Sequence, residues 1–281
     1  MKQFGIHVTL FLSLSTLAVS AHAVITCTSV TSPGFSTAYS GVVNNVTATF
    51  FTATCSRSSL ADAATVTYQV GVNNGLNNTG GQNRAKLGAN FISYDTYKDA
   101  GCTTLWKLNG GTRITDTITL NGTLATTKQT TFYGCITVAN QVVPAGIYVD
   151  TLNMTLSYPG GSVGGAFGAN IATPATCSIT TAPSTLTFNY TAFGAAVNNS
   201  TNYQITCTSF LAYAMSLGAT NPVSGVASGI NYSLTLGTTS STGTGAAQTF
   251  SIAGAAAASQ AGTCGAASCS ATNVHTLTIT Y

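Results

Sequence analysis

Short runs of apolar and β-branched residues recur along the chain, separated by clusters of Gly, Asn, Ser and Pro. Within these runs apolar residues tend to fall at every second position, the spacing of a strand with one buried face, and helical periodicity is almost absent. The pattern favours an all-β sandwich or barrel. It predicts strands over 46–54, 65–72, 91–97, 112–120, 148–158, 186–190, 203–208 and 232–236, and the alanine run at 255–258, which has glycines on both sides, is interpreted as a loop or edge strand.

The pattern also repeats. The first half opens with ITCTS around Cys27 and has its next cysteine at Cys55, whereas the second half opens with ATCSI around Cys177 and has its next cysteine at Cys207. The two intervals are nearly equal, and each half ends in a strand whose last residue is a tyrosine. The sequence therefore predicts two tandem domains built to one plan, over 24–160 and 174–281.

The two terminal strands, 148–158 and 274–281, can be aligned on their last tyrosine. In this alignment the apolar face of the first strand corresponds to every second residue of the last strand. We therefore expect one face of the last strand to point inward. The residues at these positions are His275, Leu277, Ile279 and Tyr281.

Charge separates the halves. Charged residues make up 5% of the chain, and none of them lies between residue 159 and the last residue. The formal net charge is only +3, which is too small to indicate a nucleic-acid partner.

Residues 1–23 have the features of a secretory signal peptide: Lys2, a short apolar run and the small-x-small sequence Ala21-His22-Ala23. The alternative, a membrane anchor, would need about 20 apolar residues. Eight cysteines behind such a signal predict disulfides. The repeat favours Cys27–Cys55 and Cys177–Cys207 as equivalent bridges, then Cys102–Cys135 and Cys264–Cys269; swapped pairings remain open.

Candidate chemistry is sparse. No cysteines have the C-x-x-C spacing of a zinc site, and His275 is the only histidine after residue 23. No carboxylate lies in the second half, so His275 is expected to pack in or beside a groove. Asp95 and Asp99 could share one face, although a solvated turn near Lys98 explains them as well. We therefore expect neither an enzyme nor a cofactor or metal site.

The first half contains four notable stretches: RAKL at 84–87, ISYDTYKD at 92–99, LW at 105–106 and GIYVDTL at 146–152. Together they resemble the spore coat protein U domain family, which includes subunits of archaic chaperone–usher pili. The second half is similar at 251–254 and Gln260, but the Gly-x-Tyr-x-Asp element is replaced over 270–274. The resemblance covers the whole chain after the signal peptide, as two tandem domains.

The resemblance implies immunoglobulin-like sandwiches that lack one strand, with the second domain incomplete. It implies a periplasmic chaperone that covers the resulting groove, an outer-membrane usher, and a neighbouring pilin subunit that fills the groove by strand addition. In this setting 161–173 is interpreted as a donor strand supplied in cis to the first domain, through Val163, Phe167, Ala169 and Ile171. The alternative is an interdomain linker of no special structure.

Cleavage after Ala23 would leave three residues before Cys27, about 10 Å of extended chain and too short for a donor strand. We therefore expect the tip subunit, an adhesin, of a pilus on the surface of a Gram-negative bacterium. Candidate adhesive loops are 32–43, with Phe35 and Tyr39, 73–81 and 120–128, unless Phe35 and Tyr39 pack beneath their loop.

Two rival functions remain. One is a secreted coat protein that does not polymerise through an usher. The other is a glycan-binding module, which would need a cluster of surface aromatics; Trp106, the only tryptophan, is instead expected in the core.

Overall fold

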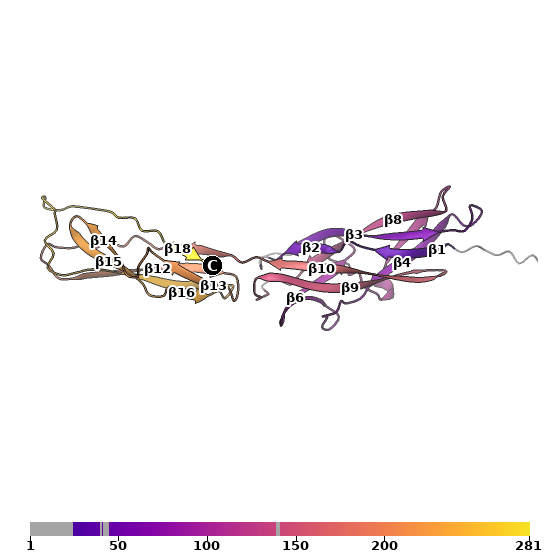
Figure 1. The fold of residues 1–281 in the computed structure, drawn as a ribbon, viewed down its shortest axis with the longest axis horizontal. Coiled ribbons are helices and arrows are strands. Elements are labelled where there is room, and N and C mark those ends of the chain that lie inside the picture. Colours follow the sequence, from indigo (N-terminus) through magenta and orange to yellow (C-terminus); the bar gives the residue numbers. More distant parts are fainter. Residues whose placement is uncertain (1–24, 40, 42–44, 139–140) are drawn as a thin grey trace, which may run out of the picture.

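The computed structural model describes residues 25–39, 41, 45–138 and 141–281. The chain forms two β units in line, joined by a short segment (Figure 1). The predicted signal peptide lies outside the described residues. Within the described part of the chain, no helix is long and apolar enough to cross a membrane.

The first unit contains ten strands. In chain order these are β1 (Thr26–Thr31), β2 (Phe35–Ala38), β3 (Asn45–Ser56), β4 (Thr65–Val72), β5 (Asn83–Leu87), β6 (Asn90–Tyr97), β7 (Ile114–Thr119), β8 (Ala125–Ile136), β9 (Gly146–Tyr158) and β10 (Gly161–Thr173), with a 3-10 turn, η1 (Gly110–Thr112), before β7.

These strands form two layers of one curled sheet. β1, β3, β8 and the end of β6 make one layer. β6 changes layer because its residues 90–94 pair with β5 while 95–97 pair with β8. The other layer contains β7, β4, β9, β10 and β2.

Aromatic side chains fill the space between the layers. Trp106 is completely buried, as predicted, and its ring centroid lies 4.4 Å from that of Phe132 and 6.2 Å from that of Phe167. Its Nε1–H donates to the Val70 carbonyl at 2.7 Å, so the indole has no unpaired polar atom. Burial of each such ring stabilises the fold by about 1.5–3 kcal/mol.

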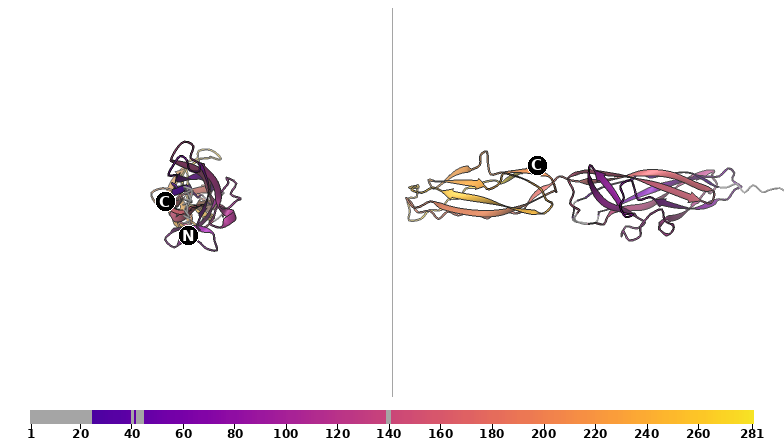
Figure 2. Two further views of the ribbon diagram at one scale, coloured as in Figure 1. Left: turned by 90° about the vertical axis from the view of Figure 1, so that its right-hand side faces the viewer. Right: turned by 90° about the horizontal axis from the view of Figure 1, so that it is seen from below.

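The second unit contains eight strands in two separate sheets. These are β11 (Cys177–Thr181), β12 (Val197–Cys207), β13 (Ala212–Ser216), β14 (Val223–Ala227), β15 (Ile230–Leu236), β16 (Ser240–Thr242), β17 (Ala247–Ala256) and β18 (Thr278–Thr280). One sheet has the order β11-β12-β17-β15-β14 and the other β16-β13-β18. The right-hand view of Figure 2, from below, shows this unit in line with the first.

The core of the second unit is less completely covered. Tyr203, Ile205 and Met215 are buried, but Leu186, Phe188 and Phe250 are only half-buried although they pack against that core. In the first unit, by contrast, nearly all large core side chains are fully enclosed.

The predicted all-β fold class is confirmed: the described chain forms two tandem β units, a curled ten-stranded sheet followed by a unit of two sheets. Four disulfides are present, and they join the cysteines in the pairs that the repeat favours: Cys27–Cys55, Cys102–Cys135, Cys177–Cys207 and Cys264–Cys269.

Two local predictions are wrong. Residues 186–190 form no strand, because no neighbouring strand offers them a ladder of hydrogen bonds. The alanine run begins inside β17, which pairs with both β12 and β15, so Ala255 and Ala256 belong to a central strand.

Candidate functional site

β10 is an integral strand of the first unit. It forms a hairpin with β9, in which thirteen residue pairs run from Gly161↔Tyr158 to Thr173↔Gly146, and it pairs in parallel with β2 on its other side. Residues 161–173 are therefore not a structureless linker. Because β10 lies between β9 and β2, it closes the layer to which both strands belong.

The four residues proposed for an in-cis donor strand lie on the inner face of β10. Phe167 has 4% of its surface exposed, Ala169 and Ile171 are fully buried, and Val163 is half-buried against the same core. Gly165 fits where no side chain could, since a Cβ there would lie 1.9 Å from the Val30 carbonyl oxygen.

A tyrosine–glutamine contact occurs at equivalent places in both units. In the first, the Gln141 N–H donates to Tyr39 Oη at 2.7 Å, and the Gln141 side-chain amide bonds both main-chain groups of Ser93. In the second, the Gln260 N–H donates to Tyr190 Oη at 2.9 Å, and its amide does the same with Asn231. The contact therefore aligns Tyr39 with Tyr190.

This alignment extends to the strands. In the first unit β4 pairs with β7 and β9, and in the second β13 pairs with β16 and β18. β18 thus corresponds to β9, and residues 186–189 correspond to β2. Among the described residues, β18 pairs with β13 alone, so the edge that corresponds to the β10 side of β9 is open.

The same comparison shows apolar surface beside this open edge. Val30 and Ile179 lie at equivalent positions, because their pairing partners do. Val30 pairs with Ala53, two residues before Cys55, and Ile179 pairs with Ile205, two residues before Cys207. Val30, which β10 covers, is 1% exposed, whereas Ile179 is 40% exposed. We call the region between β18 and residues 186–190, with Ile179, the open groove.

The predicted groove residues of the last strand divide into two groups. His275, Leu277 and Ile279 are half-buried, and His275 Nε2 lies 2.8 Å from Tyr232 Oη. Tyr281, which we expected on the same inward face, is 58% exposed. It lies beyond β18, where the ladder to β13 has ended.

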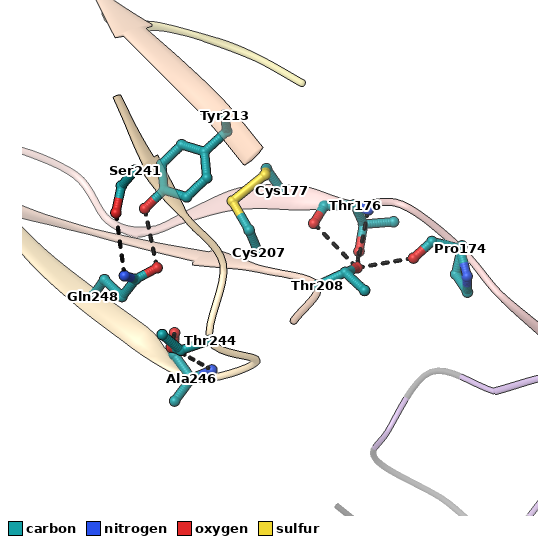
Figure 3. The surroundings of a disulfide bond; sticks show 10 residues. All are labelled: Pro174, Thr176, Cys177, Cys207, Thr208, Tyr213, Ser241, Thr244, Ala246 and Gln248. Atoms are coloured by element: carbon teal, nitrogen blue, oxygen red, sulfur yellow. Dashed lines mark hydrogen bonds between the residues drawn. A yellow bond between two sulfur atoms is a disulfide. The ribbon is translucent and has the colours of Figure 1, made fainter. Parts of the chain in front are cut away.

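The segment between the units is held at the start of the second. Thr208 Oγ1 donates to the Pro174 carbonyl at 2.9 Å and accepts from the Thr176 N–H at 3.1 Å, next to the Cys177–Cys207 bridge (Figure 3). The chain leaving β10 is therefore fixed to the end of β12 within a few residues.

The prediction that Phe35 and Tyr39 form an exposed adhesive patch is wrong. Phe35 is 5% exposed and packs edge-on against Tyr94, and Tyr39 is 1% exposed. Both belong to the segment that β10 covers, so the alternative, packing beneath the loop, applies. Residues 40 and 42–44 of that loop lie outside the described residues.

Two loops expose apolar side chains at the end of the first unit where β9 turns into β10. The sequence did not identify loop 57–64, and it identified loop 120–124 only as part of 120–128. Leu60 in 57–64 is 59% exposed, and Leu124 in 120–124 is 50% exposed. Arg57 links the loops, since its guanidinium donates to the carbonyls of Asp62, Leu120 and Thr123. A buried arginine beside two exposed leucines is a signal that spacing alone does not reveal.

The two candidate carboxylates do not form a pair. Asp95 is buried against Lys107, with Nζ 2.5 Å from Oδ1, whereas Asp99 is half-buried and accepts the Thr103 and Thr104 N–H groups. The solvated-turn interpretation therefore holds for Asp99 only. Among the described residues, no three His, Cys, Asp or Glu lie where they could hold a metal ion.

The model of the Spore Coat Protein U domain family matches residues 13–155, half of the chain. No curated protein matches this chain.

Two solved structures are similar in part. One is the CsuC–CsuE chaperone–tip adhesion subunit pre-assembly complex from the archaic chaperone-usher Csu pili of Acinetobacter baumannii, at 13% identity, covering 91% of this chain and 98% of that one, with a TM-score of 0.38. The other is the CupB6 tip adhesin from Pseudomonas aeruginosa, at 12% identity, covering 75% and 78%, with a TM-score of 0.37.

Proposed function

Since this chain belongs to the Spore Coat Protein U domain family, we propose that it is an exported, non-enzymatic pilus subunit whose second unit accepts a strand from a neighbouring subunit. One observation carries the proposal: Ile179 is 40% exposed where its counterpart Val30 is 1% exposed beneath β10. The second unit repeats the plan of the first without the strand that completes it.

β10 supplies a template for the incoming strand. It runs antiparallel to β9 and parallel to β2, with alternate side chains entering the core. By equivalence, a donor would run antiparallel to β18 and parallel to 186–189, and would cover Ile179, Leu186 and Phe188. Main-chain hydrogen bonds would supply affinity and the alternate side chains specificity.

An uncovered groove of this kind invites pairing with other chains. We infer that a periplasmic chaperone covers it after export, that an outer-membrane usher exchanges the chaperone for the neighbouring subunit, and that β10 performs the same covering role for the first unit within one chain.

Self-complementation tests the open groove. Tyr281 aligns with Tyr158, so residues 159–173 appended directly after Tyr281 would copy the β9–β10 hairpin in the second unit. We expect the second unfolding transition in calorimetry to rise by about 5 °C or more, because apolar surface becomes buried.

The matched control is the same extension carrying Phe167→Asn, Ala169→Asn and Ile171→Asn, which keeps the length but removes the apolar face. Equal transitions for the two extended proteins would contradict the groove. A soluble, fully cooperative second unit without chaperone or extension would favour the alternative, a secreted coat protein that needs no usher.

The tip position rests on the predicted cleavage after Ala23. It is supported by the path of the described chain, in which Ile25 is 4% exposed and Thr26 already belongs to β1, so these residues are engaged in their own unit. N-terminal sequencing of the exported protein tests this. A mature chain that begins ten or more residues before Cys27 would contradict it.

We assign the adhesive surface to loops 57–64 and 120–124, in place of Phe35 and Tyr39. Their leucines are exposed at the end of the first unit remote from the second, and Arg57 fixes one loop to the other. Isolated apolar side chains on rigid loop tips suit attachment to hydrophobic surfaces.

The double variant Leu60→Ser/Leu124→Ser should lower retention on a hydrophobic surface several-fold with little change in thermal stability, because both side chains are exposed. Leu76→Ser, at a 69% exposed leucine on another loop, is the control and should leave retention unchanged. Equal loss in the control would assign adhesion to general surface hydrophobicity instead.

A further inference from the structure

A hollow of about 490 Å³ lies on the side of the first unit, between the loop that follows β4 and the segment that follows β6. Its volume falls within the range of small-molecule sites. It is separate from the open groove of the second unit and from loops 57–64 and 120–124, which we call the leucine loops. Its lining includes Val72, Asn74, Gln82, Asp95, Leu105 and Asn109.

Charged side chains hold the first of the two walls. The Asp150 carboxylate accepts the Leu76 N–H at 3.0 Å and the Tyr94 hydroxyl at 2.8 Å, and Arg84 Nε donates to the Asn77 carbonyl at 2.8 Å. These bonds hold residues 75–77 of the loop in place.

The other wall is held in the same way. Lys98 Nζ donates to the Arg113 carbonyl at 2.7 Å, and Arg113 Nε donates to the Leu108 carbonyl at 2.6 Å. The chain has only eight basic and five acidic residues, yet six of them hold these walls or form the floor between them. The hollow is therefore formed before any ligand arrives, which lowers the entropic cost of binding.

A buried ion pair forms the floor. Lys107 Nζ lies 2.5 Å from Asp95 Oδ1 and 2.8 Å from Asn83 Oδ1, and all the hydrogen bonds that Asp95 accepts within the described chain go to Oδ1. Asp95 Oδ2 is left as an acceptor. Asn83 Nδ2, next to the pair, is buried without a partner among the described residues, and such groups are rare in folded proteins.

The rim of the hollow, in contrast to its charged floor, carries uncharged side chains. The side chains of Asn74, Gln82 and Asn109, three residues that line the hollow, make no hydrogen bond to the described protein, so each amide keeps a free donor and a free acceptor. Leu105, 38% exposed, supplies an apolar wall. The charges of Lys107 and Asp95 neutralise each other, so the hollow has no net charge to attract an ion.

The lining of the hollow contains no aromatic residue, so it lacks the surface cluster of a dedicated glycan-binding module. We propose instead that it is a weak site for a small, uncharged, polyhydroxylated ligand, such as one sugar residue. Hydroxyl groups both donate and accept, which matches amides beside a carboxylate oxygen, and the C–H face of a sugar ring matches Leu105. The ligand can be a free sugar or the terminal residue of a glycan. This role does not depend on strand addition or on the leucine loops.

Saturation-transfer NMR on the full exported chain tests the site, with glucose, mannose, galactose and N-acetylglucosamine as free sugars and as their methyl glycosides. We expect at least one probe to bind in the millimolar range, as suits a shallow site. Methyl glycosides that bind as well as free sugars would indicate the end of a glycan; free sugars alone would indicate a soluble sugar.

The variants Gln82→Ala and Asn109→Ala should each weaken binding about tenfold without lowering thermal stability, because neither amide bonds the protein. Gln129→Ala, at an exposed residue of β8 outside both the hollow and loops 57–64 and 120–124, is the matched control and should bind as the parent does. The proposal is overturned if no probe binds at 50 mM (a concentration of about ten times the expected Kd), or if the rim variants and the control bind alike.

Discussion

At the scale of single residues, the second unit is identified as a copy of the first by a contact rather than by a motif. Gln141 and Gln260 each donate the main-chain N–H to a tyrosine hydroxyl and bond both main-chain groups of one other residue through the side-chain amide. Each glutamine thereby joins three segments of its own unit.

Replacing these amides should affect one unit at a time. Gln141→Ala should destabilise the first unit and Gln260→Ala the second, each by about 1–3 kcal/mol, since main-chain groups of Ser93 or Asn231 lose their partners. Calorimetry resolves the two transitions. Gln129→Ala, at an exposed residue of β8, is the control, and a shift in both transitions from one variant would contradict the assignment.

At the scale of elements, the alternation of apolar residues predicts strands well where a partner strand exists. The sequence predicts a strand at β10 because Phe167, Ala169 and Ile171 occupy every second position, and the structure buries all three. Residues 186–190 alternate equally well, yet form no strand, because a strand also needs a partner and alternation does not report one.

The adhesive residues could not be found in this way. Phe35 and Tyr39 lie among Gly and Ser, which suggests an exposed loop, but β10 and Tyr94 cover them from more than fifty residues away. Long-range contacts of this kind decide burial, and a single sequence does not encode them in its spacing.

Two neighbouring glycines test whether β10 belongs to the first unit in solution. Gly165→Ala should destabilise that unit by about 1–3 kcal/mol, because its Cβ would meet the Val30 carbonyl oxygen at 1.9 Å. Gly164→Ala, whose Cβ would lie 3.8 Å from the nearest atom, should cost little. Chemical denaturation measures both, and equal stabilities would show that β10 does not lie against β1.

At the scale of the whole molecule, charge is confined to the first unit. Hydrogen bonds from the Thr104 and Thr103 N–H groups lower the pKa of Asp99. Burial acts to raise the pKa of Asp116, but the hydrogen bonds from Lys128 and Thr130 outweigh it, so this pKa is lowered too. Their stabilising contribution is present above the ordinary carboxyl pKa, near 4, and is lost as the pH falls through the lowered values.

Between pH 4.5 and pH 2.5 the first transition should therefore fall by several degrees, although Asp95, whose pKa burial raises, opposes the trend. The second transition should stay nearly constant, since no Asp or Glu side chain lies after Asp150 and histidines titrate at higher pH. Scanning calorimetry across this interval measures both. Asp116→Asn should flatten the first curve, and a second transition that falls as steeply would contradict the explanation.

The hairpin of β9 and β10 has a mechanical consequence. If the leucine loops hold a surface while the second unit is pulled, tension enters the first unit through Thr173 and is directed along β10. Its thirteen paired residues on β9, with β2 on the other side, then resist in shear, so their hydrogen bonds share the load instead of breaking one by one. An attached cell would thus load its most extensive strand pairing lengthwise, the direction in which a β ladder is strongest.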